Sequence, residues 1–467
     1  MSKSPAERVC DRLDQPETFN ECLALAQKFV RQPSVSGTGE GIREMAELVR
    51  TTLFEELGVE AKVYDTPGHP IVMGGLDVGA KKTVLFYGMY DVQPVEDTGW
   101  KSPAYACNVV ADEEFGDCVI GRGIFNSKGP LANTITALKL YKEEHGEFPV
   151  NLKFCIEGEE ELGSPSLPAF LKEHAEELAC DEAYFSFYSD DSSGKTLVYL
   201  GAKGMVFAEI SCEGGEWGGP ADGSRHGAYF CFAHNPAWVL VQALNTLVDR
   251  DQKTLRIDGI YDKVREPDEK TRKLLEAFEG SGIVSRVSRD LGAKTMKPAA
   301  SESAFMLDGL LRPSINIDGI ETGYMGEGNK TILPHIAKAR IDIRLVPDMD
   351  ALEVAELLKG HFVKAGFGDT IKVKIESAYP CSSTSVDDPA NAAWLAAYER
   401  LGANVEVWPI IPGTAPFQAF EDYLGVKITT GGLGFGGRQH NPNEFVQLEG
   451  MRKFTKSVAL FLEELAK

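Results

Sequence analysis

The stretch LFYGMYDVQPVEDTGW at residues 85–100 is the clearest guide to the architecture, because it joins a buried strand to a polar turn. Its first residues continue the apolar run KTVLFYG, which is typical of a strand buried on both faces of a sheet. Asp91 follows that strand, and a Val-Gln-Pro turn comes after it. Open α/β sheets carry their functional groups at the carboxyl ends of the strands. The stretch therefore predicts a sheet edge with Asp91 at a functional site.

Helices and strands alternate around this stretch. Helical spacing relates Ile42, Met45, Val49, Leu53 and Leu57, and Gly58 is a natural stop. Downstream, the pattern predicts a helix over 129–146, a strand over 149–158 and a helix over 164–178 that begins at Ser164-Pro165. This alternation indicates an α/β fold with a largely parallel sheet.

The pattern changes near Gly201 and indicates an inserted domain. Residues 338–348, KARIDIRLVPD, alternate apolar and polar side chains as a half-buried strand does, and a helix from Asp350 and the strand TIKVKIES follow. From about Asp388 the chain returns to its earlier character. We therefore predict a catalytic domain formed by residues 1–203 and 380–467, split by a small α/β-sandwich lid at 204–379.

Composition excludes several classes of protein. The 467 residues carry 70 acids against 48 bases, a formal charge of −22, which argues against nucleic-acid binding. No apolar run reaches the length of a membrane span, so no membrane association is expected. The N-terminus lacks the apolar core of a signal peptide, and we expect a cytoplasmic protein. The nine cysteines form no C-x-x-C pair, which disfavours a disulfide framework or a cysteine-rich zinc site.

Five polar clusters follow predicted strands in the larger domain. If the strands share one parallel sheet, their end loops converge on one rim. Carboxylates and imidazole at such a rim suit zinc or manganese, with one carboxylate left as general base. The clusters are Met89 with Asp91, Asn126 in GRGIFNSKGP, Glu160 with Glu161 in EGEEELGS, Asp190 with Asp191 in YSDDSS, and His440 with Glu444 in FGGRQHNPNE.

These clusters resemble the motifs of the metallopeptidase family that includes aminoacylases, carnosine dipeptidases and succinyl-diaminopimelate desuccinylase. The family motifs read G-H-x-D, G-R-G-x-x-D-x-K-G, E-G-x-E-E-x-G-S, S-D and H-x-x-N-E. Here the matching stretches are GMYD at 88–91, GRGIFNSKG at 121–129, EGEEELGS at 157–164, SD at 189–190 and HNPNE at 440–444. The resemblance covers nearly the whole chain. It implies a zinc-peptidase-like catalytic domain with an inserted lid, and a homodimer formed through that lid.

The resemblance also implies roles for the matched residues and reveals two departures. Glu160 resembles the general base, Asp91 the residue that orients the first histidine ligand, and the metal ligands are matched by Glu161, Asp190 and His440. Met89 replaces that histidine, and Asn126 replaces the aspartate that bridges two metals. A neutral amide screens two cations poorly, and a thioether is a poor zinc ligand beside hard oxygens. We therefore expect one divalent metal, zinc or manganese, with Asn126 as a further ligand, or none.

The lid supplies the remaining candidates by the same resemblance. Either Arg225 or His226 takes the place of a family histidine that polarises the scissile carbonyl across the dimer interface, and both remain open. Arg344 resembles the residue that binds the substrate carboxylate, to which the guanidinium fork is suited. Asn329 and Thr414 are expected to bind substrate with it. The R-E-G-G-S-I-P motif of dipeptidase relatives is replaced by IIPGTAP at 410–416.

The sequence favours a hydrolase of an amide bond in a small carboxylate-bearing N-acyl amino acid or dipeptide-like substrate. Two alternatives stay open: a metal-independent enzyme that uses the same acids, and a non-catalytic protein that binds a small carboxylate. The glycine-rich GLGFGG at 432–437 is followed by RQHNPNE and not by an apolar helix, which disfavours dinucleotide binding. The chain also has no G-x-S-x-G elbow of a serine hydrolase.

Overall fold

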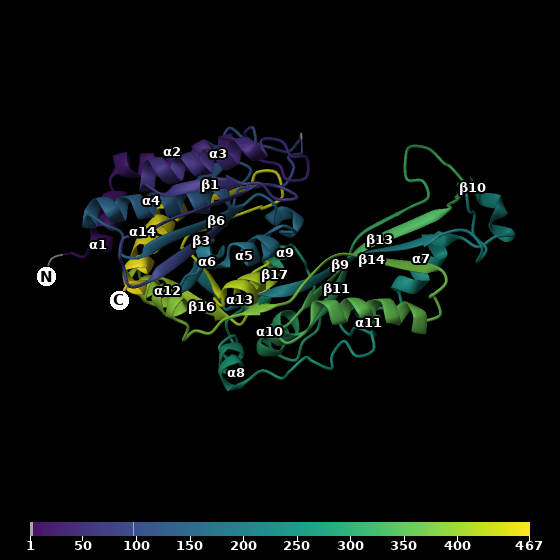
Figure 1. Cartoon of the computed structure of the whole chain (residues 1–467). Helices are drawn as coiled ribbons and strands as arrows, with labels where there is room; N and C mark the ends of the chain where they lie inside the picture. The colour runs from purple at the N-terminus through teal and green to yellow at the C-terminus, as the bar shows by residue number, and fades with distance from the viewer. Residues whose placement is uncertain (1–2, 97) are drawn as a thin grey trace. The chain divides into compact units, whose positions relative to one another are not determined.

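A computed structural model describes residues 3–96 and 98–467, and the chain divides into two compact units (Figure 1). Unit 1 combines Met1–Gly201, Thr384–Trp408 and Phe417–Lys467. Unit 2 combines Ala202–Ser383 with Pro409–Pro416. The insertion predicted at 204–379 lies inside unit 2. The segment 409–416, which the sequence placed in the catalytic domain, belongs to unit 2 because its strand β17 (Ile411–Thr414) pairs with β9 (Gly201–Glu213).

Unit 1 is built on a six-stranded sheet with the order β1-β2-β6-β3-β7-β18. The strands β6, β3, β7 and β18 run parallel to one another, whereas β1 and β2 pair antiparallel at one side. The sheet is therefore mixed, and its parallel half corresponds to the predicted one. Its strands are β1 (Glu60–Tyr64), β2 (Ile71–Leu76), β3 (Thr83–Met89), β6 (Asn151–Glu157), β7 (Glu182–Ser186) and β18 (Ile428–Gly431).

Helices cover both faces of this sheet. Successive β3 side chains point to opposite faces and nearly all are buried, so both faces must be covered. Phe86 contacts Tyr184, which packs in turn against Trp394 of α12 and Phe461 of α14. The next residue, Tyr87, points to the opposite face and contacts Phe420 of α13. The helices of unit 1 are α1 (Pro5–Leu13), α2 (Pro16–Arg31), α3 (Ile42–Thr52), η1 (Leu53–Leu57), α4 (Lys128–His145), η2 (Glu160–Leu162), α5 (Leu167–Glu173), α6 (Ala175–Leu178), α12 (Pro389–Arg400), α13 (Gln418–Leu424) and α14 (Leu448–Leu465).

The helix predicted over 164–178 is two short helices. Pro168 lies in the first turn of α5, where its missing N–H costs nothing. His174 leaves the helical conformation between α5 and α6, and its ring packs on Phe170 with centroids 4.4 Å apart. The periodic apolar pattern continues through the break, so the sequence did not show it.

A second, antiparallel sheet of unit 1 has the order β19-β20-β5-β4. A parallel pair, β8 and β16, forms a third small sheet. These short strands are important because their loops carry two of the predicted site residues. They are β4 (Asn108–Asp112), β5 (Gly116–Ile120), β8 (Lys195–Tyr199), β16 (Asn404–Trp408), β19 (Gly436–Gly437) and β20 (Phe445–Gln447).

Unit 2 is an antiparallel sheet with the order β11-β13-β9-β14, and helices α7 and α11 pack on it through a core of aliphatic side chains. On the β13 face toward this core lie Ile341, Ile343 and Leu345, as the alternation predicts. The other elements are α7 (Pro236–Leu244), α8 (Glu269–Glu276), α9 (Ile283–Leu291), α10 (Glu302–Leu311), α11 (Ala351–Lys364), β10 (Arg225–His226), η3 (Gly227–Cys231), β11 (Ser314–Thr322), β12 (Ile332–Leu333), β13 (Ile336–Leu345), β14 (Ile371–Tyr379) and β15 (Ser382–Ser383).

Among residues 3–96 and 98–467, no helix combines the length and the apolarity needed to cross a bilayer.

Candidate active site

Asp91 holds the turn that carries both glutamates of the EGEEELGS motif. It follows β3 and is completely buried, and its two carboxylate oxygens accept the backbone N–H groups of Glu160 at 3.2 Å and Glu161 at 3.0 Å. Gly158 allows the close approach of the two strand ends, because a Cβ there would lie 2.5 Å from the ring of Tyr90. The sequence assigned Asp91 to the orientation of a histidine, and here its carboxylate orients the glutamate turn.

Asn126 and His440 do not come from the large sheet. Asn126 follows β5, and His440 lies between β19 and β20, so both belong to loops of the antiparallel sheet. The expectation of one parallel sheet behind all five clusters is therefore wrong for these two residues. Local sequence shows that a loop follows a strand, but it does not show which sheet that strand joins.

The carboxylate of Glu444 fixes these two loops together. It is buried, pairs with the guanidinium of Arg122 at 2.9 Å, and accepts the backbone N–H groups of Gly123, Phe125 and Asn126 at 3.0–3.1 Å. Burial raises the pKa of Glu444, while these backbone N–H groups and Arg122 oppose the shift. The peptide bond between Asn126 and Ser127 is cis.

Glu161, His440 and Asn126 form the centre of the candidate site. His440 Nε2 lies 3.2 and 3.1 Å from the two carboxylate oxygens of Glu161. Asn126 Nδ2 donates to Glu161 Oε1 at 2.8 Å and lies 3.3 Å from His440 Nε2. Gln93, in the turn after Asp91, donates to Glu161 Oε2 at 2.9 Å. The predicted proximity of Glu161 and His440 is thus present in unit 1.

Asp190 and Met89 have other surroundings. The two oxygens of Asp190 accept hydrogen bonds from Thr196 Oγ1 at 2.7 Å and from the N–H of Gly434 at 2.8 Å. Met89 is 1% exposed and ends β3 as an apolar core residue. The partners of the Asp190 carboxylate are therefore a hydroxyl and a backbone N–H, and Met89 brings an apolar side chain to the end of β3.

Burial and mutual repulsion raise the proton affinity of the acids around the glutamate turn. Burial, followed by repulsion from Glu161, raises the pKa of Asp91 to about 7. Burial, followed by repulsion from Glu161 and then Asp91, raises the pKa of Glu160 well above its usual range. Burial also raises the pKa of Glu157 to about 8 although Tyr87 OH donates to it. Acids arranged in this way are candidates for proton transfer.

Two basic groups accompany these acids. A hydrogen bond with Glu161 raises the pKa of His440, which favours the imidazolium form in the absence of a competing cation. Lys128 is fully buried at the start of α4, and burial lowers its pKa to about 7 although Asp91 and Glu444 oppose the shift. Lys128 Nζ donates to the carbonyl of Gln32 at 2.5 Å.

Glu161, His440 and Asn126 are the neighbouring residues of this site that could bind a divalent metal. Within the described part of the chain, no three His, Cys, Asp or Glu side chains converge on a common metal position. Glu161 and His440 are the residue types that could supply two ligands. Asn126 presents its Nδ2 to both of them, while its amide oxygen accepts from Ser127 Oγ at 2.9 Å, so the amide must rotate before that oxygen can be a third ligand. Asp190 is a further carboxylate, and each of its two oxygens accepts one hydrogen bond.

The predicted substrate-binding residues lie in unit 2. Arg344 donates to Asp342 and, through NH1, to Thr414 Oγ1 at 3.2 Å, and Tyr379 OH donates to the same oxygen at 3.0 Å. Arg344 and Thr414 are thus neighbours in unit 2. Asn329 lies exposed in the loop between β11 and β12.

Arg225 and His226 form the short strand β10, which pairs with β12. The guanidinium of Arg225 is bound to Asp222 and to the carbonyl of Gly223. His226 Nδ1 accepts the N–H of Ala228 at 3.2 Å, and its Nε2 lies 3.2 Å from Thr331 Oγ1. Both side chains are exposed on unit 2, and neither takes precedence as the catalytic group.

Sequence reasoning missed three supporting residues. Gln93 binds Glu161, Tyr379 binds Thr414, and Thr196 binds Asp190. The only signal for Gln93 was its place in the turn after Asp91. Tyr379 and Thr196 follow ordinary strand patterns, and nothing local distinguishes them from other strand residues.

The helix-covered mixed sheet, the paired glutamates and the facing histidine define a hydrolase of the metallopeptidase class. Residues 85–464 match the model of peptidase family M20/M25/M40, and the chain belongs to that family.

Relatives of known activity match over most of their length. The Cys-Gly metallodipeptidase DUG1 of Saccharomyces cerevisiae is 30% identical over 87% of this chain and 85% of its own. The human Beta-Ala-His dipeptidase is 27% identical over 96% of this chain and 90% of its own. A solved structure, the M20 family metallo-carboxypeptidase Sso-CP2 from Sulfolobus solfataricus, is 32% identical with a TM-score of 0.86, covering 96% of this chain and 99% of that one.

Glu444→Ala should destabilise unit 1, because it leaves the buried guanidinium of Arg122 without its counter-charge. We expect the free energy of unfolding to fall by about 3–5 kcal/mol, measured by urea titration with circular dichroism. Glu449→Ala is the matched control, because the Glu449 side chain is 62% exposed, although its partner Arg452, 3.1 Å away, is 20% exposed, and the substitution should cost about 0–1 kcal/mol. Equal effects of the two substitutions would contradict the assignment.

Proposed function

We propose that this hydrolase cleaves the amide bond of a small dipeptide or N-acyl amino acid that carries a free carboxylate. The observation that carries the proposal is the Asp91 carboxylate, which holds Glu160 and Glu161 side by side at the end of β6. Glu161 is thereby turned toward His440 and Asn126, and Glu160 is left as a half-buried carboxylate of raised pKa. Names of the relatives suggest Cys-Gly and β-Ala-His as first substrates to assay.

Glu160 is the proposed general base. A carboxylate with a raised proton affinity accepts a proton from water more readily, and the same proton can then pass to the leaving nitrogen. Burial, followed by repulsion from Glu161, keeps the pKa of Glu160 high, and Asp91 and Glu157 add to the shift when they are ionised. Asp91 is proposed as a positioning residue, because its carboxylate accepts the backbone N–H groups of Glu160 and Glu161.

We propose that Glu161, His440 and Asn126 hold one divalent metal, zinc or manganese. When bound, such an ion polarises the scissile carbonyl and lowers the pKa of a water ligand. His440 then contributes a neutral imidazole, which requires loss of the proton that Glu161 stabilises. Gln93 binds the Glu161 carboxylate from the turn that follows the neighbouring parallel strand β3. Asp190 is expected to support this ligand set less directly, because Thr196 and Gly434 engage its oxygens.

Unit 2 supplies the proposed substrate contacts. Arg344 would bind the substrate carboxylate with its guanidinium fork, and Thr414 and Asn329 would add hydrogen bonds. Arg225 or His226 would stabilise the oxyanion. Because both side chains are exposed on unit 2, a second copy of the chain is a suitable recipient for them.

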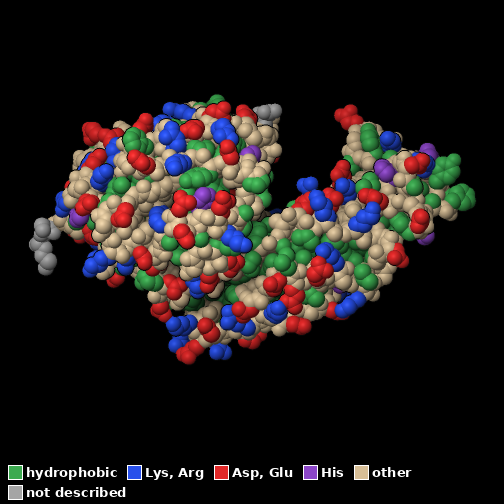
Figure 2. Space-filling view, viewed as in Figure 1, with side chains coloured by type: hydrophobic (Ala, Val, Ile, Leu, Met, Phe, Trp, Pro, Cys, Tyr) green, Lys and Arg blue, Asp and Glu red, His purple; other side chains and the backbone are tan. Residues whose placement is uncertain are grey.

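Exposed apolar side chains on unit 2 support a homodimer. Phe232 is 86% and Trp238 58% exposed near β10, and Figure 2 shows hydrophobic side chains gathered at that end of the unit. Strand β11 is an edge strand that exposes Ile317 and Ile320, and such an edge can pair with another copy. The expected cytoplasmic location stays a prediction from the N-terminal sequence.

Glu160→Gln should abolish most hydrolysis, because the amide cannot take up a proton. We expect kcat for Cys-Gly or another accepted dipeptide to fall by about 10²–10⁴-fold. Glu113→Gln, on the exposed turn between β4 and β5, removes the same charge and should leave kcat unchanged. A variant at Glu160 that keeps normal kcat would refute the role of this carboxylate.

Metal content tests the one-ion site. The protein purified without chelators should hold at most one tightly bound divalent ion per chain, measured by mass spectrometry with elemental analysis. Met89→His combined with Asn126→Asp should raise the number toward two, because the bridge restores the negative charge that two cations need. Two zinc or manganese ions in the unmutated chain would show that Met89 and Asn126 are ligands after all.

Arg344→Lys should weaken substrate binding, because an ammonium cannot make the paired contact of the guanidinium. The expected loss is about 1–3 kcal/mol, seen as a rise in KM at nearly constant kcat. Arg340→Lys, an exposed position on the same strand, is the control and should keep the normal KM. Equal KM values for the Arg344 and Arg340 variants would exclude Arg344 as the carboxylate ligand.

A further inference from the structure

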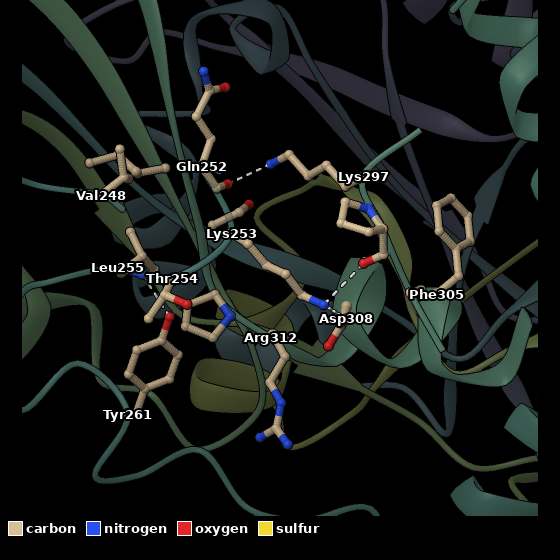
Figure 3. A pocket seen from close by; sticks show the side chains of 16 residues that line it. Val248, Gln252, Lys253, Thr254, Leu255, Tyr261, Lys297, Phe305, Asp308 and Arg312 are labelled. Carbon is tan, nitrogen blue, oxygen red and sulfur yellow. Dashed lines mark hydrogen bonds and ion pairs between the residues drawn. The ribbon is translucent and has the colours of Figure 1, made fainter. Parts of the chain in front are cut away.

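Unit 2 contains a cavity that the proposed reaction does not use. Its volume is about 510 Å³, within the usual range for small-molecule sites. The walls are formed by residues 248–255, by the segment 297–299, by α10 and by the start of β11 (Figure 3). Every lining residue belongs to unit 2, and none is among the candidate active-site residues.

Two lysines link the walls of this cavity, and each donates a hydrogen bond to a backbone carbonyl next to the other lysine. Lys297 Nζ donates to the carbonyl of Gln252 at 2.7 Å, and Lys253 Nζ donates to the carbonyl of Pro298 at 3.2 Å (Figure 3). Lys253 also pairs with Asp308 of α10 at 2.6 Å. In the described part of the chain, the partner of the Lys297 ammonium is a neutral carbonyl, so its charge is not compensated by direct contact with an acid.

The lining is positive in a protein that is strongly negative. Three cations, Lys253, Lys297 and Arg312, line the cavity with the single acid Asp308, whereas the whole chain carries a charge of −22. Arg312 pairs with Glu266 at 2.8 Å, which leaves about one net positive charge. Behind the wall, the buried Lys203 donates to the carbonyls of Gly309 and Arg312. These clustered cations are not needed to keep an acidic protein soluble, so solubility does not explain them.

Apolar and aromatic groups complete the lining. Leu255 is buried, and Tyr261, Phe305 and Ile315 are half-buried on the cavity walls. Tyr261 OH accepts the N–H of Leu255 at 2.9 Å and keeps its own proton for donation. Such a lining accepts an apolar body and offers a few donors for one anionic end.

We propose that this cavity binds a small organic carboxylate with an aromatic or aliphatic body. The carboxylate would lie against Lys297 and Lys253, and its body against Tyr261 and Leu255. A phosphate dianion is a poorer match, because the lining has about one uncompensated positive charge and is largely apolar.

Isothermal titration of the full chain with phenylacetate, benzyl alcohol, benzylamine and inorganic phosphate tests the proposal. Phenylacetate should bind saturably, and the neutral, cationic and phosphate probes should bind at least about tenfold more weakly. No saturable binding of phenylacetate, or tighter binding of any other probe, would overturn the assignment of ligand class.

Substitutions locate the binding in this cavity. Lys297→Gln should weaken phenylacetate binding about tenfold, while Lys359→Gln, which removes an exposed lysine of α11, should leave it unchanged. Asp308→Asn should strengthen binding, because it frees Lys253, and a merely unfolded variant cannot give that result. Arg344→Gln should retain binding, since Arg344 lies outside the cavity. Loss of binding in Arg344→Gln, or normal binding in Lys297→Gln, would place phenylacetate elsewhere.

Discussion

The buried carboxylate of Glu444 is the contact on which the site in unit 1 depends. It gathers one guanidinium and the backbone N–H groups of three residues from a loop more than three hundred positions earlier in the chain. A buried ion pair contributes little net stability, but removing one partner is costly, so the two loops are difficult to separate. Asn126 and His440 therefore meet Glu161 although neither belongs to the sheet that carries it.

Asp91 provides a second fixed point, and it explains how the glutamate turn can persist beside Met89. In the family pattern that the sequence resembles, this carboxylate serves a histidine. Here its oxygens accept two backbone N–H groups of the glutamate turn, a role that does not depend on the residue at position 89. The substitution therefore alters the donor set for a metal while the positions of Glu160 and Glu161 are maintained by the backbone.

The sequence was sufficient for the parts of the fold that repeat a local pattern. The apolar run before Asp91 identified β3, and the alternation in residues 338–348 identified β13. The motifs also named Glu161 and His440, which lie side by side in the structure. Three features could not be obtained in this way. The loops that carry Asn126 and His440 belong to a second sheet, which is formed by long-range strand pairing. The break at His174 lies inside a continuous apolar pattern. The pairing of β17 with β9 joins residues about two hundred positions apart, which no local preference encodes.

The contact between Arg344 and Asp342 has a consequence for turnover. Asp342 is buried and already neutralises the guanidinium before any substrate arrives. If Arg344 binds the substrate carboxylate as proposed, that carboxylate shares the guanidinium with Asp342. Arg344 therefore binds the substrate more weakly than an unpaired arginine would. The amino acid released by hydrolysis keeps the same carboxylate and meets the same competition. An arginine that binds its ligand only in part favours rapid release of product, which suits an enzyme whose substrate and product present the same charged end.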